Sequence, residues 1–164
     1  MAFAAILDGK NAVQTQVYGP ESRGGACRSE VIISDTDIDY PQVTFPDLCL
    51  VMSQESYDRF GDDIKPGGTL IVDNTQIEEK DNHVDIRVFS SPITEITRSK
   101  LGKTIVANMV ALTVLNEVVG LVNPESILQA ILNRVPDKYA DLNRQAFELG
   151  KEIAKGFPSM NIIC

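Results

Sequence analysis

The sequence has few residues of the kinds that bind metals and iron–sulfur clusters. Its 164 residues include three cysteines and one histidine. Cys27, Cys49 and Cys164 are far apart and have no CxxC spacing. Such a pattern lacks the ligand set of a zinc or iron–sulfur site and is typical of a chain kept in a reducing compartment. We therefore expect a cytoplasmic protein with no metal site of its own.

The sequence also lacks an excess of positive charge. Fifteen lysines and arginines stand against 23 aspartates and glutamates, which gives a formal net charge of −8. Sequence-independent binding to nucleic acid or to an anionic membrane needs clustered basic side chains. We therefore expect no nucleic-acid partner and no membrane partner.

No segment has the features of a signal peptide or of a membrane span. The first ten residues, MAFAAILDGK, have no basic region ahead of their apolar residues and no convincing cleavage site. The longest apolar segment, residues 104–122, contains Asn108, Asn116 and Glu117, which are costly inside a bilayer. A buried core helix explains this segment better.

The length and composition fit one domain that spans residues 1–164. Hydrophobic residues make up 43% of the chain and charged residues 23%, which is enough for a core, and no linker, repeat or low-complexity tract divides it. Short β-rich runs between turn residues predict strands at 12–17, 29–34, 47–52, 69–74 and 84–89. The runs at 47–52 and 69–74 are nearly all apolar, which is typical of parallel strands covered on both faces.

Helices are predicted between and after these strands. Residues 53–61 give a short helix with Ser53 as N-cap, and with the strands on either side it forms a right-handed βαβ unit. Three later helices are predicted, at about 103–122, from Pro124 behind an Asn123 cap to a stop at Pro136, and over 137–156. The last one is expected to place on one face Tyr139, Leu142, Ala146, Leu149 and Ile153.

The stretch TQVYGPESRGG, residues 15–25, combines three glycines with a proline, a glutamate and an arginine. Glycines after a strand let backbone N–H groups converge on an anion, and Arg23 could add a two-pronged charged donor. The same residues also suit a tight turn in which the glycines supply positive φ and Arg23 forms a surface ion pair. Composition by itself favours the turn, because the spacing is neither GxGxxG nor GxxxxGK[ST].

The wider pattern, however, resembles a known family. The segments QTQVYGPESRGGACRSEVIISDTDIDYP, PDLCLVMSQESYDRF, IKPGGTLIVDNTQI and GKTIVANMVALTVLNEVVGLV are similar to the gamma subunit of the 2-oxoacid:ferredoxin oxidoreductases, nearest to the 2-oxoglutarate type. The resemblance covers nearly the whole chain. The residues that match the most specific part of the family pattern are Tyr18, Gly19, Pro20, Glu21, Arg23, Gly24, Gly25 and Ser29.

The resemblance implies an α/β fold, a Rossmann-like three-layer sandwich with a mostly parallel sheet and a helical C-terminal part. It also implies a place in an enzyme that oxidatively decarboxylates a 2-oxoacid to an acyl-coenzyme A and passes the electrons to ferredoxin. Thiamine diphosphate and the iron–sulfur clusters are then held by alpha and beta subunits, with a delta subunit in some members. This chain would bind no cofactor alone, would be inactive alone, and would lie near the coenzyme A side.

The residues of the glycine stretch take roles in this interpretation. Gly19, Gly24 and Gly25 would let another chain or coenzyme A approach the backbone closely, Pro20 would stiffen the loop, and Arg23 would bind a carboxylate or phosphate. Glu21 would pair with Arg23 or with a basic residue of a partner. We expect the stretch from Tyr18 to Ser29 to lie at a subunit or coenzyme A interface.

The sequence departs from the family pattern at its beginning. Gamma subunits usually open with a strand and a GxGGQG turn, followed by a helix, and AFAAILDG matches the end of that helix. A doubly wound sheet without this central strand would expose an edge that invites pairing with another chain. A truncated chain or a misplaced start codon is favoured over a genuine variant. We also expect the isolated chain to self-associate, for example as a homodimer.

Other single residues are better explained without chemistry. We expect His83 to lie in a solvated loop, Cys49 to be a small core residue, and the alternating aspartates in SDTDIDYP to form an exposed turn rather than a calcium site. Asp73 ends a predicted strand, where open α/β sheets bind ligands, but it also suits a plain turn. Cys27 is a weak candidate for a nucleophile beside Arg23 or Arg28.

Two other function classes stay open from the sequence. The chain could be a free-standing nucleotide- or coenzyme A-binding module, or an enzyme with its own chemistry at Asp73 or Cys27. The first predicts saturable binding by the isolated chain, and the second predicts an activity of the isolated protein that substitutions of these two residues abolish.

Overall fold

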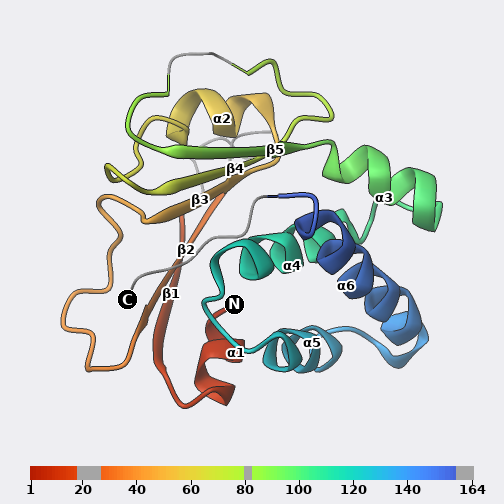
Figure 1. Cartoon of the computed structure of the whole chain (residues 1–164). Helices are drawn as coiled ribbons and strands as arrows, with labels where there is room; N and C mark the ends of the chain where they lie inside the picture. The colour runs from red at the N-terminus through yellow and green to blue at the C-terminus, as the bar shows by residue number, and fades with distance from the viewer. Residues whose placement is uncertain (18–26, 80–82, 158–164) are drawn as a thin grey trace.

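The computed structural model describes residues 1–17, 27–79 and 83–157. Its central element is a parallel sheet of three strands in the order β3-β4-β5 (Figure 1). The strands are β3 (Leu48–Val51), β4 (Thr69–Asp73) and β5 (Arg87–Ser91). Parallel pairing and the α/β class therefore agree with the sequence.

The predicted βαβ unit is present. Between β3 and β4 lies α2 (Gln54–Phe60), whose N-cap Ser53 accepts a hydrogen bond from the Ser56 N–H at 3.3 Å. Gly61 follows its last residue, as predicted. The strand predicted at 84–89 is displaced to Arg87–Ser91, because Asp85 has a φ of 60° and this left-handed residue interrupts an extended backbone.

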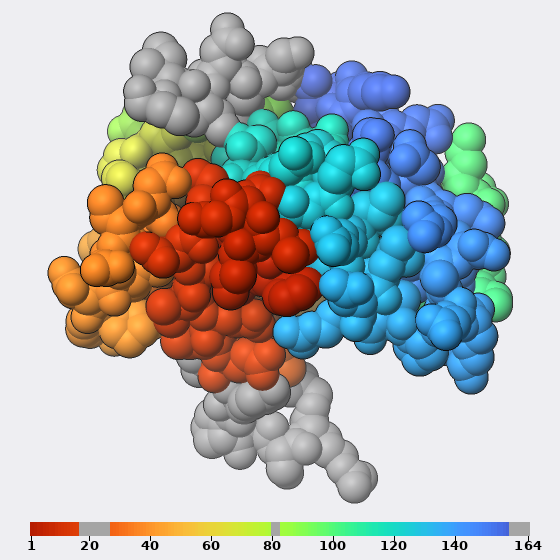
Figure 2. Space-filling model, turned by 90° about the horizontal axis from the view of Figure 1, so that it is seen from below, coloured from red at the N-terminus to blue at the C-terminus, as the bar shows by residue number. Residues whose placement is uncertain are grey.

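A separate antiparallel hairpin precedes this sheet. Strand β1 (Asn11–Val17) pairs with β2 (Arg28–Ser34) over seven residue pairs, from Asn11 opposite Ser34 to Val17 opposite Arg28. Helix α1 (Ala2–Leu7) comes before it, as the resemblance implies. Figure 2 shows α1 on the lower face of the molecule, between the hairpin side and the α5 side.

The helical half follows β5 and consists of more pieces than the sequence predicts. Its helices are α3 (Ile93–Leu101), α4 (Ala107–Val119), α5 (Pro124–Leu132) and α6 (Ala140–Ala154), with a 3₁₀ turn at Asp137–Tyr139. Helix α3 was not predicted. The helix predicted at 103–122 is shorter at both ends: α4 begins at Ala107, and Gly120 in a left-handed conformation ends it after Val119.

The second and third predicted helices are present with small differences. Asn123 caps α5, with its side chain accepting from the Glu125 N–H at 3.0 Å, and Pro124 is the first helical residue. Helix α5 ends at Leu132, before Pro136. Of the face predicted for α6, Tyr139 is exposed because it lies in the 3₁₀ turn rather than in the helix.

The core has one cluster on each face of the parallel sheet and a third under α1. One face of the sheet, represented by Ile71 and Phe89, packs on α4 and α6. The other face, with Leu70 and Val72, packs on Tyr57 of α2. This arrangement is the three-layer sandwich that the sequence implies. The third cluster joins α1 to α5 and to Phe147 of α6.

Helices α4 and α6 pack closely at a glycine. A Cβ added at Gly150 would lie 2.8 Å from the Val110 carbonyl oxygen and 2.6 Å from the Thr113 Cβ. A side chain at this position would therefore force the two helices apart.

The polar residues of the apolar segment 104–122 are used inside the protein. Asn116 is buried, its amide donates to the Val122 carbonyl at 2.9 Å, and its side-chain oxygen accepts from the Val122 N–H at 3.1 Å. It thus holds the turn between α4 and α5. None of the described helices is long and apolar enough to cross a membrane.

Candidate functional site

The predicted site residues fall at the end of the β1–β2 hairpin. Of the eight residues that match the family pattern, seven lie outside the described residues, namely Tyr18, Gly19, Pro20, Glu21, Arg23, Gly24 and Gly25. Ser29 is described. It lies in β2, is exposed, and accepts a hydrogen bond from the Gln14 amide at 3.4 Å. The pairing of Val17 with Arg28 fixes both ends of the connecting segment side by side.

A polar cluster that the sequence did not predict holds the base of this segment. Arg28 forms an ion pair with Glu30 at 2.6 Å, and its guanidinium lies 5.1 Å from the centre of the Phe60 ring. The nearly buried Glu30 carboxylate also accepts from the Thr15 hydroxyl at 3.1 Å and from the Val43 N–H at 3.3 Å. The hairpin is therefore anchored to both the 35–47 segment and α2.

The contacts of Arg28 with Glu30 and with the Phe60 ring hold the end of the hairpin in place. A carboxylate with several donors and a guanidinium over an aromatic ring each restrict a side chain that would otherwise be free. The sequence RSE in β2 indicates the ion pair of Arg28 with Glu30, because residues two apart in a strand lie on the same face.

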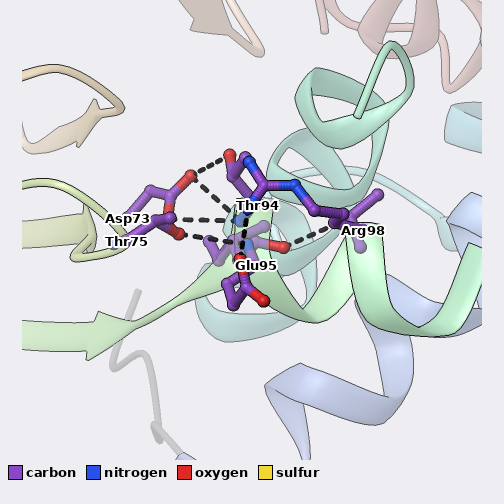
Figure 3. A network of polar contacts seen from close by, with 7 residues as sticks. Asp73, Thr75, Thr94, Glu95 and Arg98 are labelled. Atoms are coloured by element: carbon purple, nitrogen blue, oxygen red, sulfur yellow. Dashed lines mark hydrogen bonds and ion pairs between the residues drawn. The ribbon is translucent and has the colours of Figure 1, made fainter. Parts of the chain in front are cut away.

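The carboxyl edge of the parallel sheet is the usual ligand position of an open α/β fold. Here the buried carboxylate of Asp73, the last residue of β4, takes that position (Figure 3). It accepts from the Thr94 N–H at 3.1 Å and from the Thr94 hydroxyl. It also accepts from the Thr75 N–H at 3.2 Å and from the Thr75 hydroxyl at 2.6 Å.

These bonds give Asp73 a structural role. Thr94 lies in the first turn of α3, so the Asp73 carboxylate satisfies a backbone donor at a helix N-terminus, the position that an anionic ligand would occupy. The Thr75 hydroxyl donates to Asp73 and accepts from the Glu95 N–H at 3.1 Å, which extends the cap. Figure 3 also shows Arg98 paired with Glu95, at 2.6 Å. The protein thus fills this ligand position with its own carboxylate.

His83 does not lie in a solvated loop, and that prediction was wrong. Its side chain is only 8% exposed, its Nδ1 is 3.3 Å from an Asp62 carboxylate oxygen, and its Nε2 is 2.7 Å from the hydroxyl of the buried Tyr57. Tyr57 belongs to α2, so His83 fastens its own loop to that helix. The sequence spacing of 26 residues between the two gave no signal for this contact.

The two described cysteines do not form a metal site. Cys27 is exposed and Cys49 is half-buried in β3, against the cluster under α2. Burial raises the pKa of the Cys49 thiol to about 11, so the neutral form dominates at physiological pH, and a neutral thiol is a poor metal ligand. Over residues 1–17, 27–79 and 83–157, no group of three or more His, Cys, Asp or Glu side chains is arranged to hold a metal ion.

Comparison with known proteins identifies close relatives. The 2-oxoglutarate synthase subunit KorC of Methanocaldococcus jannaschii is 45% identical over 153 residues, covering 93% of this chain and 82% of the relative. The crystal structure of a keto/oxoacid ferredoxin oxidoreductase gamma subunit from Geobacter sulfurreducens is 40% identical, with a TM-score of 0.80 over 96% of this chain and 88% of that one.

A third protein shows the same fold inside a longer polypeptide. The 2-oxoglutarate:ferredoxin oxidoreductase from Magnetococcus marinus, solved with 2-oxoglutarate, coenzyme A and succinyl-CoA bound, matches 98% of this chain with a TM-score of 0.83. Its sequence identity is 22% and the match covers 28% of that chain. The profile of one family, pyruvate ferredoxin/flavodoxin oxidoreductase, matches residues 1–153. The chain therefore belongs to this oxidoreductase family and is of the gamma-subunit type.

Proposed function

We propose that this chain is the gamma subunit of a cytoplasmic, multi-subunit oxidoreductase that converts 2-oxoglutarate to succinyl-coenzyme A and passes the electrons to ferredoxin. The observation that carries the proposal is the 45% identity to a 2-oxoglutarate synthase subunit over 93% of the chain. The free-standing nucleotide- or coenzyme A-binding module is not favoured, because these relatives are named as subunits.

The chemistry in this proposal belongs to the complex. Alpha and beta subunits, and in some members a delta subunit, hold thiamine diphosphate and the iron–sulfur clusters, and ferredoxin receives the electrons there. The described cysteines support this division, since one is a neutral half-buried thiol and neither lies in a group of metal ligands. Asp73 supports it as well, because its buried carboxylate already accepts hydrogen bonds from Thr75 and from Thr94 at the start of α3.

The contribution of this chain is the segment from Tyr18 to Ser29, presented to coenzyme A or to a neighbouring subunit. What supports this is the rigid base beneath it, where Arg28 and Glu30 join β2 to the 35–47 segment and α2. Small residues at Gly19, Gly24 and Gly25 permit a close approach of another molecule, and Arg23 provides a bidentate donor for a phosphate or carboxylate.

An affinity-tagged chain, captured from an anaerobically grown lysate of its own source, tests the assembly. We expect recovery of two larger chains with thiamine diphosphate and iron.

An Arg23→Ala chain tests the Tyr18–Ser29 segment. We expect at least about a tenfold rise in the KM for coenzyme A or a comparable loss of recovered subunits. Recovery of the tagged chain alone, from a preparation with oxidoreductase activity, would contradict the proposal.

Lys65→Ala is the matched control for the loss of a basic residue. Lys65 is exposed and pairs with the exposed Asp47 at 2.9 Å, so its removal should leave coenzyme A kinetics and subunit recovery unchanged.

Without its partner subunits, the chain is expected to form homodimers. Light scattering coupled to size-exclusion chromatography would detect them, and a monodisperse monomer at tens of micromolar would contradict this prediction.

A further inference from the structure

The segment between β2 and β3, residues 35–47, is described throughout and contains neither helix nor strand. It lies on the side of the molecule away from α3 and α6 (Figure 1). Most of its residues are exposed, among them two aromatic side chains, Tyr40 at 64% and Phe45 at 67%. Long connections without secondary structure usually carry a function in compact domains, and exposed aromatic residues are enriched in protein interfaces.

The backbone of this segment is held in place although most of its side chains are exposed. The Val43 N–H donates to the nearly buried Glu30 carboxylate at 3.3 Å, and the Val43 carbonyl accepts from the Arg28 guanidinium at 3.4 Å. The Tyr40 hydroxyl donates to the side-chain oxygen of Gln42 at 2.8 Å. A surface that is ordered before binding loses less conformational entropy when a partner docks. The segment is therefore prepared for binding.

The same segment is strongly acidic. It contains four aspartates and no lysine, arginine or histidine. Asp35 and Asp47 pair with lysines. Asp37 and Asp39 are exposed beside Tyr40, and within the described part of the chain neither forms an ion pair. Aromatic side chains next to such carboxylates are complementary to a surface that carries basic side chains.

We propose that residues 37–45 dock against a basic surface of a larger subunit. Tyr40 and Phe45 supply the apolar contact, and Asp37 and Asp39 face lysine or arginine side chains of that surface. The inference rests on the proposed function, because it requires the larger subunits. It adds a second interface to the Tyr18–Ser29 segment and states the charge of the partner.

Two observations favour a larger subunit over a second copy of this chain. In a two-fold dimer the same surface of each copy meets itself, so the acidic segment would face its own carboxylates and be repelled. The segment is also joined to the base of the proposed Tyr18–Ser29 interface, through the hydrogen bonds that link Val43 with Glu30 and Arg28. A subunit bound at that interface therefore has residues 37–45 beside it.

A Tyr40→Ala variant tests the apolar contact. The affinity-tagged variant is produced in its own source and captured, and the larger subunits recovered per tagged chain are measured. We expect recovery to fall at least about tenfold, as for a central interface tyrosine. Tyr139→Ala is the matched control, because Tyr139 is 41% exposed in the 3₁₀ turn before α6, and its recovery should equal that of the wild-type chain.

The wild-type chain separates the failure of this proposal from that of the proposed function. If the wild-type chain and Tyr40→Ala recover the larger subunits equally, both being folded by circular dichroism, the docking surface is refuted and the proposed function survives. If the wild-type chain recovers none from a preparation with oxidoreductase activity, the proposed function fails, and the inference with it.

Salt elution of the captured assembly tests the charge of the partner. Asp37→Asn/Asp39→Asn removes two negative charges, so the larger subunits should leave the immobilised chain at a KCl concentration at least about twofold lower than with the wild-type chain. The control, Glu148→Gln/Glu152→Gln, removes two exposed carboxylates from α6 and should not change the release. Unchanged release from the aspartate variant, or retention to higher salt, would overturn the proposal.

Discussion

Strands β3 and β4 are neighbours in the parallel sheet and have different environments. Both have an apolar centre, in the sequences LCLV and TLIVD. Every residue of β4 is buried, whereas in β3 only Val51 is. Strand β4 has a partner on each side and β3 has one among the described residues. The apolar side chains of each strand therefore lead to packing on both faces of the sheet, and a neighbouring strand on each side is what makes a strand fully buried.

The largest expected effect comes from truncating a side chain in each strand. Ile71 and Leu50 are opposite each other in the register and belong to the same core cluster. We expect Ile71→Ala to lower the free energy of unfolding by about 3 kcal/mol, because Ile71 is fully buried, and Leu50→Ala by about 1 kcal/mol. Urea unfolding of the isolated chain measures both. Equal losses would mean that the two strands are equally buried in solution.

Next in size is the cap at the end of β4. Asp73→Ala leaves the Thr94 and Thr75 N–H groups without their acceptor, and we expect a loss of about 2–3 kcal/mol in urea unfolding. The control, Asp47→Ala beside β3, removes an exposed carboxylate paired with Lys65 and should cost less than about 0.5 kcal/mol. A similar small loss for both would contradict the capping role.

The close packing of α4 and α6, which lie over Ile71, gives a third test. Gly150→Ala should destabilise the chain by about 1–2 kcal/mol in thermal or urea unfolding, because the new Cβ meets the Val110 carbonyl and Thr113. This net loss is expected even though alanine favours a helix over glycine. Gln145→Ala, an exposed position of the same helix, is the control and should be neutral. A stabilised Gly150→Ala chain would show that α4 and α6 pack less closely.

The helix that follows β3 has a weaker cap than the one held by β4. Ser53→Ala should lower the free energy of unfolding by about 1 kcal/mol, because the Ser56 N–H loses its side-chain acceptor. Ser53→Asp supplies another acceptor and should restore most of the loss. If the aspartate variant is as unstable as the alanine variant, the effect of Ser53 lies elsewhere.

The mildest test changes no residue and uses the thiol of β3 as a probe. Burial raises the pKa of Cys49 to about 11, so its reactive thiolate is scarce at pH 8 and increases about tenfold per unit of pH up to pH 10. Alkylation followed by peptide mass spectrometry should show Cys49 reacting far more slowly than the exposed Cys27. Similar rates for the two would mean that β3 is open to solvent.

Several elements could be predicted because their signals are local. Ser53 and Asn123 were identified as caps from residue type and position, and both accept the expected backbone N–H. The apolar runs gave β3, β4 and the parallel sheet. Helix α3 was missed because Ile93–Leu101 is mostly polar, with Ile93 and Thr97 as its buried residues. Its start depends on Asp73, twenty-one positions away from Thr94.

The candidate site likewise combines a feature that the sequence shows locally with contacts between distant segments. The match from Tyr18 to Ser29 is a sequence pattern, and its function as an interface stays a prediction, with most of it outside the described residues. The anchor below it, Arg28 with Glu30, Val43 and Phe60, joins three segments of the chain. No spacing in the sequence indicates which aromatic ring or which backbone carbonyl a given arginine will find.

The sequence by itself determined the family, the α/β class and the apolar strands, because these depend on residue order and on short-range periodicity. Only the tertiary structure decided that Asp73 caps a helix and that His83 is held between Tyr57 and Asp62. Those outcomes depend on which distant donors and acceptors meet, since a buried polar group takes whichever partner the packing brings within hydrogen-bonding distance.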